Sequence, residues 1–401
     1  MSETLFYNPG TTIATDTIAT GNISVNLDLL DRWLYLRPSV SNAATIVAGM
    51  SRLANTYGQS VFGTNVFSTQ GVSNGSIFGS TTSTAMYGTT YIPGGYVFQV
   101  DGNGPGVCAL FSSKENTVTN YSIPNTGGNK GAAGTLLPDS RTLILPNSSG
   151  VNWTVWNNIT RTSSTPITLA AGQLAPTYGS CYTADGNIVV RSNQSNIFLL
   201  NTTTFAVSNA LDYGTGTAFA PGMCLDVTGN VILPPSGSSG VGVWNPNNGQ
   251  FTRITPTSNP TNPLWGATNA GDGRVVFGVT NDANNLWVYN PFTLTCTTVS
   301  YSWGAGWKFS GVRSMPDGRV LMTPWGGGTY FGIFNPYTNS ISTFTPGNGV
   351  PISYIGGTFV PDGRLIIGNN TGYSNIPVMT SLFRSIPEAW CMSPITTHGW
   401  I

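Results

Sequence analysis

Pro316-Asp317-Gly318-Arg319-Val320 and Pro361-Asp362-Gly363-Arg364-Leu365 are two copies of one short sequence signal. Five further copies, some of them degenerate, come earlier in the chain, at Gly94, Asp139, Asp185, Asp226 and Asp272. The steps between successive copies are 45, 46, 41, 46, 45 and 45 residues. A fixed period of this length indicates a repeat architecture, here with seven structural units.

A second turn signal follows the first at a nearly constant distance. It reads Trp244-Asn245-Pro246, Tyr289-Asn290-Pro291 and Phe334-Asn335-Pro336 in the clearest repeats. Asp-Gly favours a tight hairpin because Gly accepts positive φ and Asp bonds its own backbone. Asn-Pro marks another turn because Pro cannot continue a ladder of strands. Each repeat therefore has two turns at set positions.

Short β-rich runs lie between these turns, for example Arg319 to Met322, Tyr330 to Phe334 and Ser340 to Phe344 in one repeat. A further run precedes each aspartate, which makes four strands per repeat. Four strands of roughly 5–6 residues with their turns fill about 45 residues. The sequence thus predicts an all-β fold, a seven-bladed β-propeller with four-stranded blades. A flat β-sandwich with accidental periodicity is the alternative.

The repeats divide the chain into three parts. Residues 84–390 form the predicted propeller, and residues 391–401 form a C-terminal tail. Residues 1–83 lack the repeat and form either an arm that docks on a larger body or on sister copies, or a segment that closes the propeller. The runs 375–379 and 383–386 supply the later strands of the last blade, so we expect that blade to need no strand from the N-terminus.

Charge is scarce, and this scarcity limits the classes of partner. Only 7% of residues are charged, against about 25% in ordinary domains, and the net charge is zero. Nucleic acid and acidic membranes need dense positive charge, so we expect neither as a partner. The start of the chain has no signal-peptide pattern, and no apolar run is long enough to span a membrane. The five cysteines fit no zinc or disulfide pattern and are expected to be small buried apolar groups.

A search for catalytic groups yields no candidate catalytic, metal-binding or cofactor-binding residue. The one histidine, His398, lies beyond the repeats. Six acids are the repeat aspartates, which we interpret as structural turn residues: Asp139, Asp185, Asp226, Asp272, Asp317 and Asp362. An Arg two residues after several of them is placed to bridge neighbouring blades. The other propeller acids, such as Asp212 and Asp282, are dispersed, and no close pair indicates a glycosidase. We therefore predict a protein that is not an enzyme and has no cofactor.

Aromatic residues are the remaining functional signal. Several precede a small residue where the first strand of a repeat begins, and others gather near the sixth repeat. The candidate residues for binding a glycan or a partner are Tyr178, Trp265, Trp303, Trp307, Trp325 and Tyr354. If each innermost strand starts at one face, these residues ring the mouth of the channel, where aromatic planes with Asn and Ser donors suit sugars. The alternative is that they only fill the space between blades.

The Asp-Gly-Arg-Val and aromatic-Asn-Pro signals resemble kelch-like β-propeller repeats over about three quarters of the chain. The chain lacks the regular Gly-Gly pairs of kelch repeats, the Trp-Asp pairs of WD40 blades and the aspartate boxes of sialidases. Its low charge, its Asn, Thr and Gly content and its non-repeat arm are similar to bacteriophage and virus structural proteins such as spikes, fibres and decoration proteins. The similarity implies a location on the virion.

These observations lead to one preferred hypothesis and two alternatives. The preferred one is a non-enzymatic virion surface protein. Residues 1–83 dock on other virion proteins or on sister copies, and the propeller contacts a host glycan or neighbouring capsid or tail proteins. The first alternative is a free carbohydrate-binding lectin. The second is a hydrolase or lyase that acts on a polysaccharide.

Overall fold

In the computed structural model the chain is a ring of β-sheets. The structure describes residues 67–68, 86–101, 107–123, 131–146, 152–164, 167–168, 177–183, 185–192, 196–212, 222–235, 240–256, 264–279, 285–301, 309–324, 330–344, 354–369, 378–381 and 391. No helix within these ranges is long and apolar enough to cross a membrane. Apart from Cys391, the predicted tail lies outside them, as does most of the predicted N-terminal arm, so the three-part division stays a prediction.

The first four sheets come in chain order, and all their neighbouring strands are antiparallel. The first contains β2 (Met86–Ile92), β3 (Tyr96–Asp101), β4 (Val107–Ser112) and β5 (Thr117–Ser122). The second contains β6 (Gly131–Leu136), β7 (Arg141–Pro146), β8 (Asn152–Asn157), β9 (Thr162–Ser163) and β10 (Ile167–Thr168). The third contains β11 (Thr177–Tyr182), β12 (Ile188–Ser192), β13 (Asn196–Leu200) and β14 (Val207–Asp212). The fourth contains β15 (Cys224–Leu225), β16 (Val231–Leu233), β17 (Val241–Trp244) and β18 (Phe251–Ile254).

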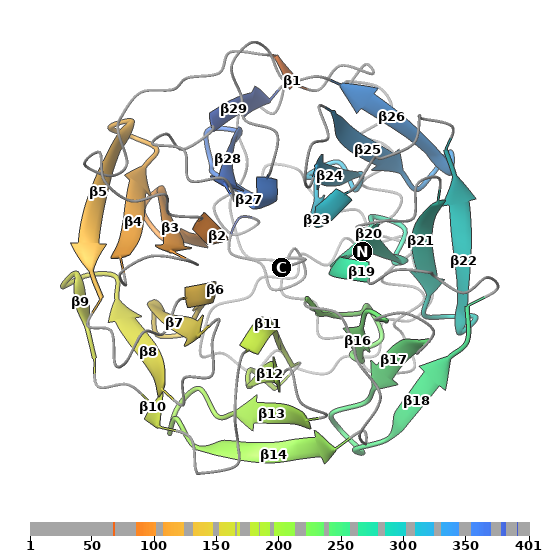
Figure 1. Cartoon of the computed structure of the whole chain (residues 1–401), viewed down its shortest axis with the longest axis horizontal. Coiled ribbons are helices and arrows are strands. Elements are labelled where there is room, and N and C mark those ends of the chain that lie inside the picture. The colour runs from red at the N-terminus through yellow and green to blue at the C-terminus, as the bar shows by residue number, and fades with distance from the viewer. Residues whose placement is uncertain are drawn as a thin grey trace, which may run out of the picture.

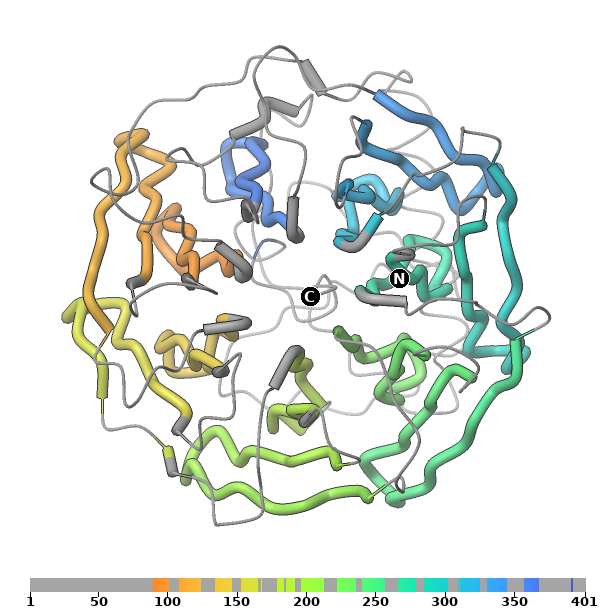
Figure 2. Tube along the Cα trace, viewed as in Figure 1, coloured from red at the N-terminus to blue at the C-terminus, as the bar shows by residue number. Residues whose placement is uncertain are grey.

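Two further sheets complete the ring. The fifth has eight strands: β19 (Leu264–Asn269), β20 (Val275–Val279), β21 (Asn285–Asn290), β22 (Thr295–Ser300), β23 (Phe309–Ser314), β24 (Val320–Pro324), β25 (Phe331–Asn335) and β26 (Ser340–Phe344). The sixth contains β27 (Tyr354–Phe359), β28 (Arg364–Asn369), β29 (Val378–Ser381) and β1 (Phe67–Ser68). The sheets stand radially around a common centre, with β2, β6, β11, β19, β23 and β27 innermost (Figure 1). The trace passes once around the ring in chain order (Figure 2).

The all-β propeller with four-stranded blades is confirmed, but the predicted number of seven blades is corrected to six by hydrogen bonding. The reason is one ladder pair, Val279 with Phe309, which joins β20 to β23. Through it the fifth and sixth repeats share the eight-stranded sheet. The turn signals mark where strands reverse, and they carry no information on whether two repeats also bond to each other.

The closure of the last sheet also differs from the prediction. Its outermost strand is β1, whose Phe67 and Ser68 pair with Ser381 and Thr380 of β29. A complete last blade with no contribution from the N-terminal segment is therefore wrong. The run 383–386, predicted to be that strand, lies outside the described residues. Residues 67–68 instead connect the start of the chain to its last repeat.

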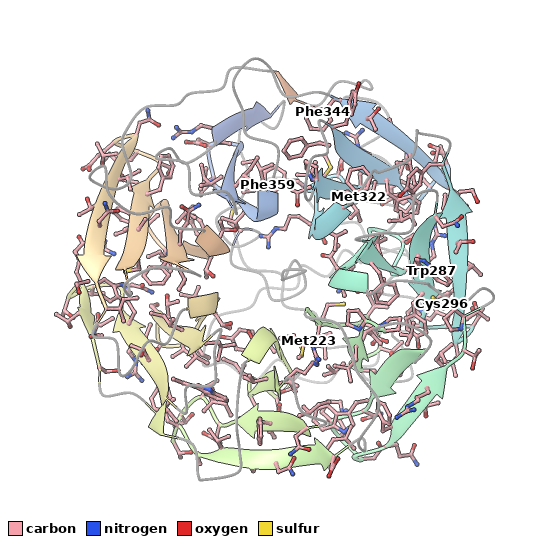
Figure 3. All side chains as sticks on the ribbon, in the orientation of Figure 1. Met223, Trp287, Cys296, Met322, Phe344 and Phe359 are labelled. Atoms are coloured by element: carbon pink, nitrogen blue, oxygen red, sulfur yellow. The ribbon has the colours of Figure 1, made fainter. Side chains whose placement is uncertain are left out.

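The apolar core lies in layers between neighbouring sheets. Many strands inside the ring pack on a neighbouring sheet with both of their faces. Runs such as Val320–Met322 are therefore buried throughout. One layer joins Trp287 and Cys296 to the fourth sheet (Figure 3). Another contains Phe331 of β25, Phe359 of β27 and Tyr91 of β2, so the last repeats pack against the first. The ring is therefore closed by hydrophobic burial, the dominant favourable term in folding.

A belt of polar contacts joins the innermost strands of neighbouring sheets. Thr135 of β6 lies 2.5 Å from Ser180 of β11, oxygen to oxygen. Thr268 of β19 and Ser314 of β23 are 2.9 Å apart in the same way. Arg313 of β23 donates from Nη2 to Thr358 Oγ1 of β27 at 3.1 Å. Because buried hydroxyl groups need partners, each contact fixes the position of one sheet against the next.

Candidate functional site

The antiparallel order places the connections of every repeat on two opposite faces. The turn from the first to the second strand and the turn from the third to the fourth lie on one side, here named the turn face. The connections from the second strand to the third, and from the fourth strand to the next repeat, begin and end on the other side, here named the loop face. Segments 302–308 and 345–353 are examples of the second kind. A binding site formed by these connections can therefore lie on the turn face or on the loop face.

The repeat aspartates all lie on the turn face, where the turn interpretation placed them. Asp272, Asp317 and Asp362 each accept hydrogen bonds from the backbone N and the Nε of the Arg two residues later. For Asp317 the side chains are buried and the Oδ2 to Arg319 Nη2 distance is 2.6 Å. Asp139 bonds Arg141 in the same way. These carboxylates are thus satisfied within their own turns.

The arginines of these turns also reach the neighbouring repeat, as the sequence predicted. Arg274 donates to Pro336 O at 2.7 Å and to Asn339 Oδ1 at 3.1 Å. Arg364 donates to Ser113 O and, at 3.0 Å, to Asn116 Oδ1. The second pair of contacts joins the last repeat to the first. The arginines of the turn face therefore hold the ring together.

Asp185 and Asp226 have no Arg in the turn, and their surroundings differ. Asp185 accepts from Thr183 and Asn187, and these hydrogen bonds outweigh the desolvation that raises its pKa, so the pKa is lowered overall. Asp226 is 4% exposed and accepts from Thr228 and Asn230. Its deeper burial dominates and raises its pKa. Neither carboxylate faces the loop face, so neither is a candidate for chemistry there.

The loop face shows a recurring irregularity. In every innermost strand of the described ladders except the two-residue β15, the register shifts near the first residue of the strand. The shift leaves Tyr178 unpaired between Thr177 and Gly179, and it brackets Trp265 between Leu264 and Ala267. A β-bulge re-aims the side chain of the extra residue, and bulges are over-represented at the rims of barrels and beside active sites. These bulges lie at the loop-face ends of the innermost strands around the ring.

Three of the six candidate aromatic residues lie in described strands, at the loop-face end of the ring. Tyr178, Trp265 and Tyr354 lie at the starts of β11, β19 and β27, which run from the loop face to the turn face. Trp303, Trp307 and Trp325 lie outside the described residues. The segments that hold them connect β22 to β23 and β24 to β25, whose flanking ends are at the loop face. The expectation that the innermost strands start at one face is thus met, and glycan binding stays a prediction.

One charged residue at the loop-face end was missed by the sequence reasoning. Arg191, near the end of β12, is 5% exposed, and its Nε and Nη1 atoms have no hydrogen-bond partner. It pairs in register with Gly179, next to the bulge at Tyr178. The available signal was a basic residue directly after the apolar run Ile188-Val189-Val190. The repeat signals lie at the turns and give no information on this strand end.

The described residues offer no other reactive constellation. No group of three or more His, Cys, Asp or Glu residues among them is placed to hold a metal ion. All five cysteines are buried, as expected, and none forms a disulfide; burial raises the pKa of Cys108 and of Cys296 to about 12. Thiols in this state are inert. The loop face therefore remains the candidate site.

Solved structures confirm the propeller fold. The chain is similar to virginiamycin B lyase from Staphylococcus aureus, with a TM-score of 0.65, 14% identity, and coverage of 78% of this chain and 99% of the other. It is also similar to the extracellular domain of a putative hybrid two-component system from B. thetaiotaomicron, with a TM-score of 0.62, 14% identity, and coverage of 79% and 43%. No protein-family model and no curated protein matches the chain. At this identity the likeness shows the fold alone.

Proposed function

We propose that this protein is a non-enzymatic virion surface protein whose loop face binds a glycan on the host surface. The observation that carries the proposal is the ring of bulges at the loop-face ends of the innermost strands, three of which bear Tyr178, Trp265 and Tyr354. Aromatic rings present a large apolar plane, and Tyr and Trp add a polar handle. A rigid scaffold that displays such residues around one opening suits recognition of an extended neutral or acidic sugar chain.

The turn face supports the same assignment by exclusion. Its Asp-Arg pairs are occupied with one another, and Arg274 and Arg364 also bond the neighbouring repeats, so these groups are engaged in holding the ring. The scarcity of charge in the chain favours hydrogen bonding and stacking over ion pairing as the general mode of recognition. Both arguments favour the loop face as the binding surface.

A glycan array on the purified full-length protein tests the binding function. Trp265→Ala is expected to lower affinity for the best glycan about tenfold, because an aromatic contact contributes roughly 0.5–1.5 kcal/mol beyond its buried area. Phe292→Ala is the matched control. Phe292 is 43% exposed in the turn between β21 and β22, on the turn face, so its loss is expected to leave binding unchanged. Silence of the wild-type protein on every glycan would contradict the proposal.

The virion location needs a separate experiment. Because residues 67–68 form β1, a deletion of residues 1–60 preserves the closing strand, whereas a deletion of residues 1–80 removes it. The shorter deletion is expected to leave the melting temperature unchanged and to abolish incorporation into particles. Normal incorporation would rule out the docking arm. Glycan binding without any particle association would then favour the free lectin.

A catalytic alternative has its own discriminator. Turnover of a bound polysaccharide that disappears in Asp212→Asn would favour a hydrolase or lyase. Asp212 is the exposed last residue of β14, at the loop-face end of the third sheet. We expect no turnover by the wild-type protein, and product formation measured on purified protein is the readout.

We further infer that the eight-stranded sheet acts as two blades, which gives seven packing units. A separate apolar layer, with Val288 of β21 and Phe334 of β25, lies between its halves, as between the other sheets. A single ladder pair joins the halves, Val279 with Phe309. Val279→Pro removes the backbone N–H of the other residue of that pair and is expected to leave the ring closed. Loss of the native fold in this variant would contradict the inference.

A further inference from the structure

The exposed apolar side chains of this protein gather in one kind of turn. Among the described residues, the exposed large apolar side chains are Ile159 at 83%, Leu294 at 53% and Phe292 at 43%. Ile159 lies in the turn between β8 and β9, and the other two lie in the turn between β21 and β22. Both turns join the third strand of a repeat to the fourth, so they lie on the turn face, at the outer rim of the ring (Figure 1).

The backbone of its turn makes Leu294 an unfavourable residue at this position. Its φ is +52°, in the left-handed region, and the equivalent positions in three other repeats are Asn116, Gly249 and Asn339, also with positive φ. Asn and Gly tolerate this region, whereas a bulky apolar side chain is strained there. Leu294 is therefore disfavoured both by its backbone conformation and by its exposure to water.

Two other bulky residues at equivalent positions are held by contacts within the protein. Phe205 of the third repeat packs on the apolar layer between the second and third sheets, with the guanidinium of Arg141 4.6 Å from the centre of its ring. The guanidinium of Arg161 in the second repeat lies 4.7 Å from the centre of the Tyr96 ring. Leu294 belongs to none of the apolar clusters in the described part of the chain. The packing that offsets the strain at the other two positions is thus missing at Leu294.

The two apolar turns are placed so that two copies of the ring can cover them mutually. They are the same turn of the second and fifth repeats, so they lie on one face at a similar distance from the centre. Consider two rings face to face, related by a two-fold axis that runs between the rings and midway between these repeats. Ile159 of each copy then lies opposite Phe292 and Leu294 of the other. Such an isologous contact forms twice and closes as a dimer.

The same two-fold arrangement is compatible in charge. It places the turn of the first repeat opposite that of the sixth, and the turn of the third opposite that of the fourth. Among the exposed residues of the described turns of this kind, the charged ones are Lys114 and Glu115, both in the first repeat. They therefore meet the exposed Thr338, whose hydroxyl can donate and accept hydrogen bonds, and do not meet their own copies. The chain has a net charge of zero, so repulsion between two copies is small.

We propose that two copies of this chain associate through their turn faces, with Ile159 of each copy packed against Phe292 and Leu294 of the other. The contact supplies the packing that Leu294 lacks in the single ring. The two loop faces point away from each other in this dimer. The inference therefore concerns another face than the proposed glycan site and does not depend on it.

Sedimentation velocity of the full-length protein at several concentrations tests the association. We expect the wild type to sediment as a dimer and Leu294→Asn to weaken the dimer about tenfold or more, because the apolar side chain is buried twice in the contact. Asn suits a positive φ, so the same variant is expected to melt at or above the temperature of the wild type. A residue that only supports the fold would not give this combination. A wild type that stays monomeric at every concentration overturns the proposal.

A charge swap tests which turns meet. Leu294→Glu and Ile159→Lys are each expected to give monomers, because each places a charge against an apolar surface. The two changes in one chain are expected to restore the dimer, since the introduced charges of opposite sign then face each other twice. Leu294→Glu with Asn247→Lys, at an exposed position in the equivalent turn of the fourth repeat, is the matched control and is expected to stay monomeric. Restoration by both combinations, or by neither, overturns the proposed contact.

Two further measurements separate this contact from the N-terminal arm and from sugar binding. The variant that lacks residues 1–60 is expected to remain dimeric and to become monomeric when Leu294→Glu is added. A monomeric deletion variant together with a dimeric full-length Leu294→Glu protein would assign the association to the arm and overturn the proposal. On the glycan array, Leu294→Glu is expected to bind as the wild type does, so failure of the dimer and failure of the glycan site are read independently.

Discussion

The turn face and the loop face of this ring are built from the same strands but differ in how their polar groups are satisfied. On the turn face, Asp317 is buried and bonds Arg319, and Arg364 crosses from the last repeat to Asn116 of the first. On the loop face, each described innermost strand of more than two residues begins with a register shift, and Arg191 is buried without acceptors at two of its nitrogens. The four Asp-Arg pairs of the turn face are engaged within the protein, whereas Arg191 on the loop face has two buried nitrogens without a partner.

This difference indicates that the two faces have separate roles. The charges of the turn face that join repeats are costly to change, because each loss leaves a partner without its bond. A face made of connections and bulges tolerates variation and leaves donors for a ligand. The predictions below test this division, from the largest expected effect to the smallest.

The largest effect is expected where two turns touch on the turn face. The backbone N of Gly271 donates to Gly318 O at 2.7 Å, and a Cβ on Gly271 would lie 2.6 Å from Gly318 Cα. Gly271→Ala forces these backbones apart and is expected to cost about 3 kcal/mol of unfolding free energy in urea. Gly186→Ala is the control. It has a φ of +85° but open space around the Cβ, so it is expected to cost about 1 kcal/mol. Equal losses would contradict the proposed contact between turns.

Ring closure by Arg364 is expected to have the next largest effect. Arg364→Ala removes the donors to Ser113 O and Asn116 Oδ1 that join the last repeat to the first, and it leaves Asp362 unpaired. The unfolding free energy is expected to fall by about 2 kcal/mol, measured by urea denaturation. Lys114→Ala is the control, because Lys114 lies between Ser113 and Asn116 in the turn that Arg364 contacts. A ring that is as stable without Arg364 would show that the apolar layers alone close it.

Asp226 and Asp139 are expected to respond to pH in opposite directions. Burial raises the folded-state pKa of Asp226, so its contribution to stability is present below the unfolded-state pKa and is lost as pH rises through the folded-state pKa. Asp226→Asn is therefore expected to raise stability at pH 7 by up to about 1 kcal/mol. For Asp139, desolvation raises the pKa, but the hydrogen bonds and charge of Arg141 outweigh it, so the pKa is lowered overall.

The contribution of Asp139 is therefore present above its unfolded-state pKa and is lost as pH falls through the lower folded-state value. The side chain of Asp139 is 44% exposed, so Asp139→Asn is expected to cost less than about 1 kcal/mol at pH 7. Thermal unfolding of both variants at pH 7 and pH 4 gives the comparison. A loss of stability at pH 7 in Asp226→Asn would show that its hydrogen bonds to Thr228 and Asn230 outweigh its desolvation.

The smallest effect is expected for the reactivity of thiols in the apolar interior, which lies between the two faces. All five cysteines are buried as thiols outside any disulfide, and burial raises the pKa of Cys108 and of Cys296 to about 12. The folded protein is therefore expected to react with no equivalent of a thiol reagent at pH 8, and the urea-unfolded protein with five. Rapid labelling of the folded chain would indicate that the layers between sheets open in solution.

The sequence predicted the turn face better than the loop face, for a physical reason. A turn is a local device, so Asp317-Gly318-Arg319 specifies its own backbone, and Arg274 and Arg364 bridge repeats as their spacing indicated. The pairing of residues 67–68 with β29 joins segments more than 300 residues apart and has no local signal. The same holds for the pair between β20 and β23, which reduces seven predicted blades to six hydrogen-bonded sheets.

The candidate site was predicted only as a list of aromatic residues. Their common face followed from the direction of the innermost strands, but the bulges depend on the register with the partner strand, which no single segment determines. Arg191 was missed because an Arg at the end of an apolar run is usually solvated there. Only the three-dimensional packing of the third and fourth sheets shows that its guanidinium is enclosed.

Hydrogen exchange of the full-length protein, with and without its best-binding glycan, tests the division between the faces most directly. The account predicts slower exchange at the loop-face starts of β11 and β19 and at the end of β12, with no change in the turns around Asp272 and Asp317. Slower exchange confined to those turns, or no change at either face under saturating glycan, would contradict it.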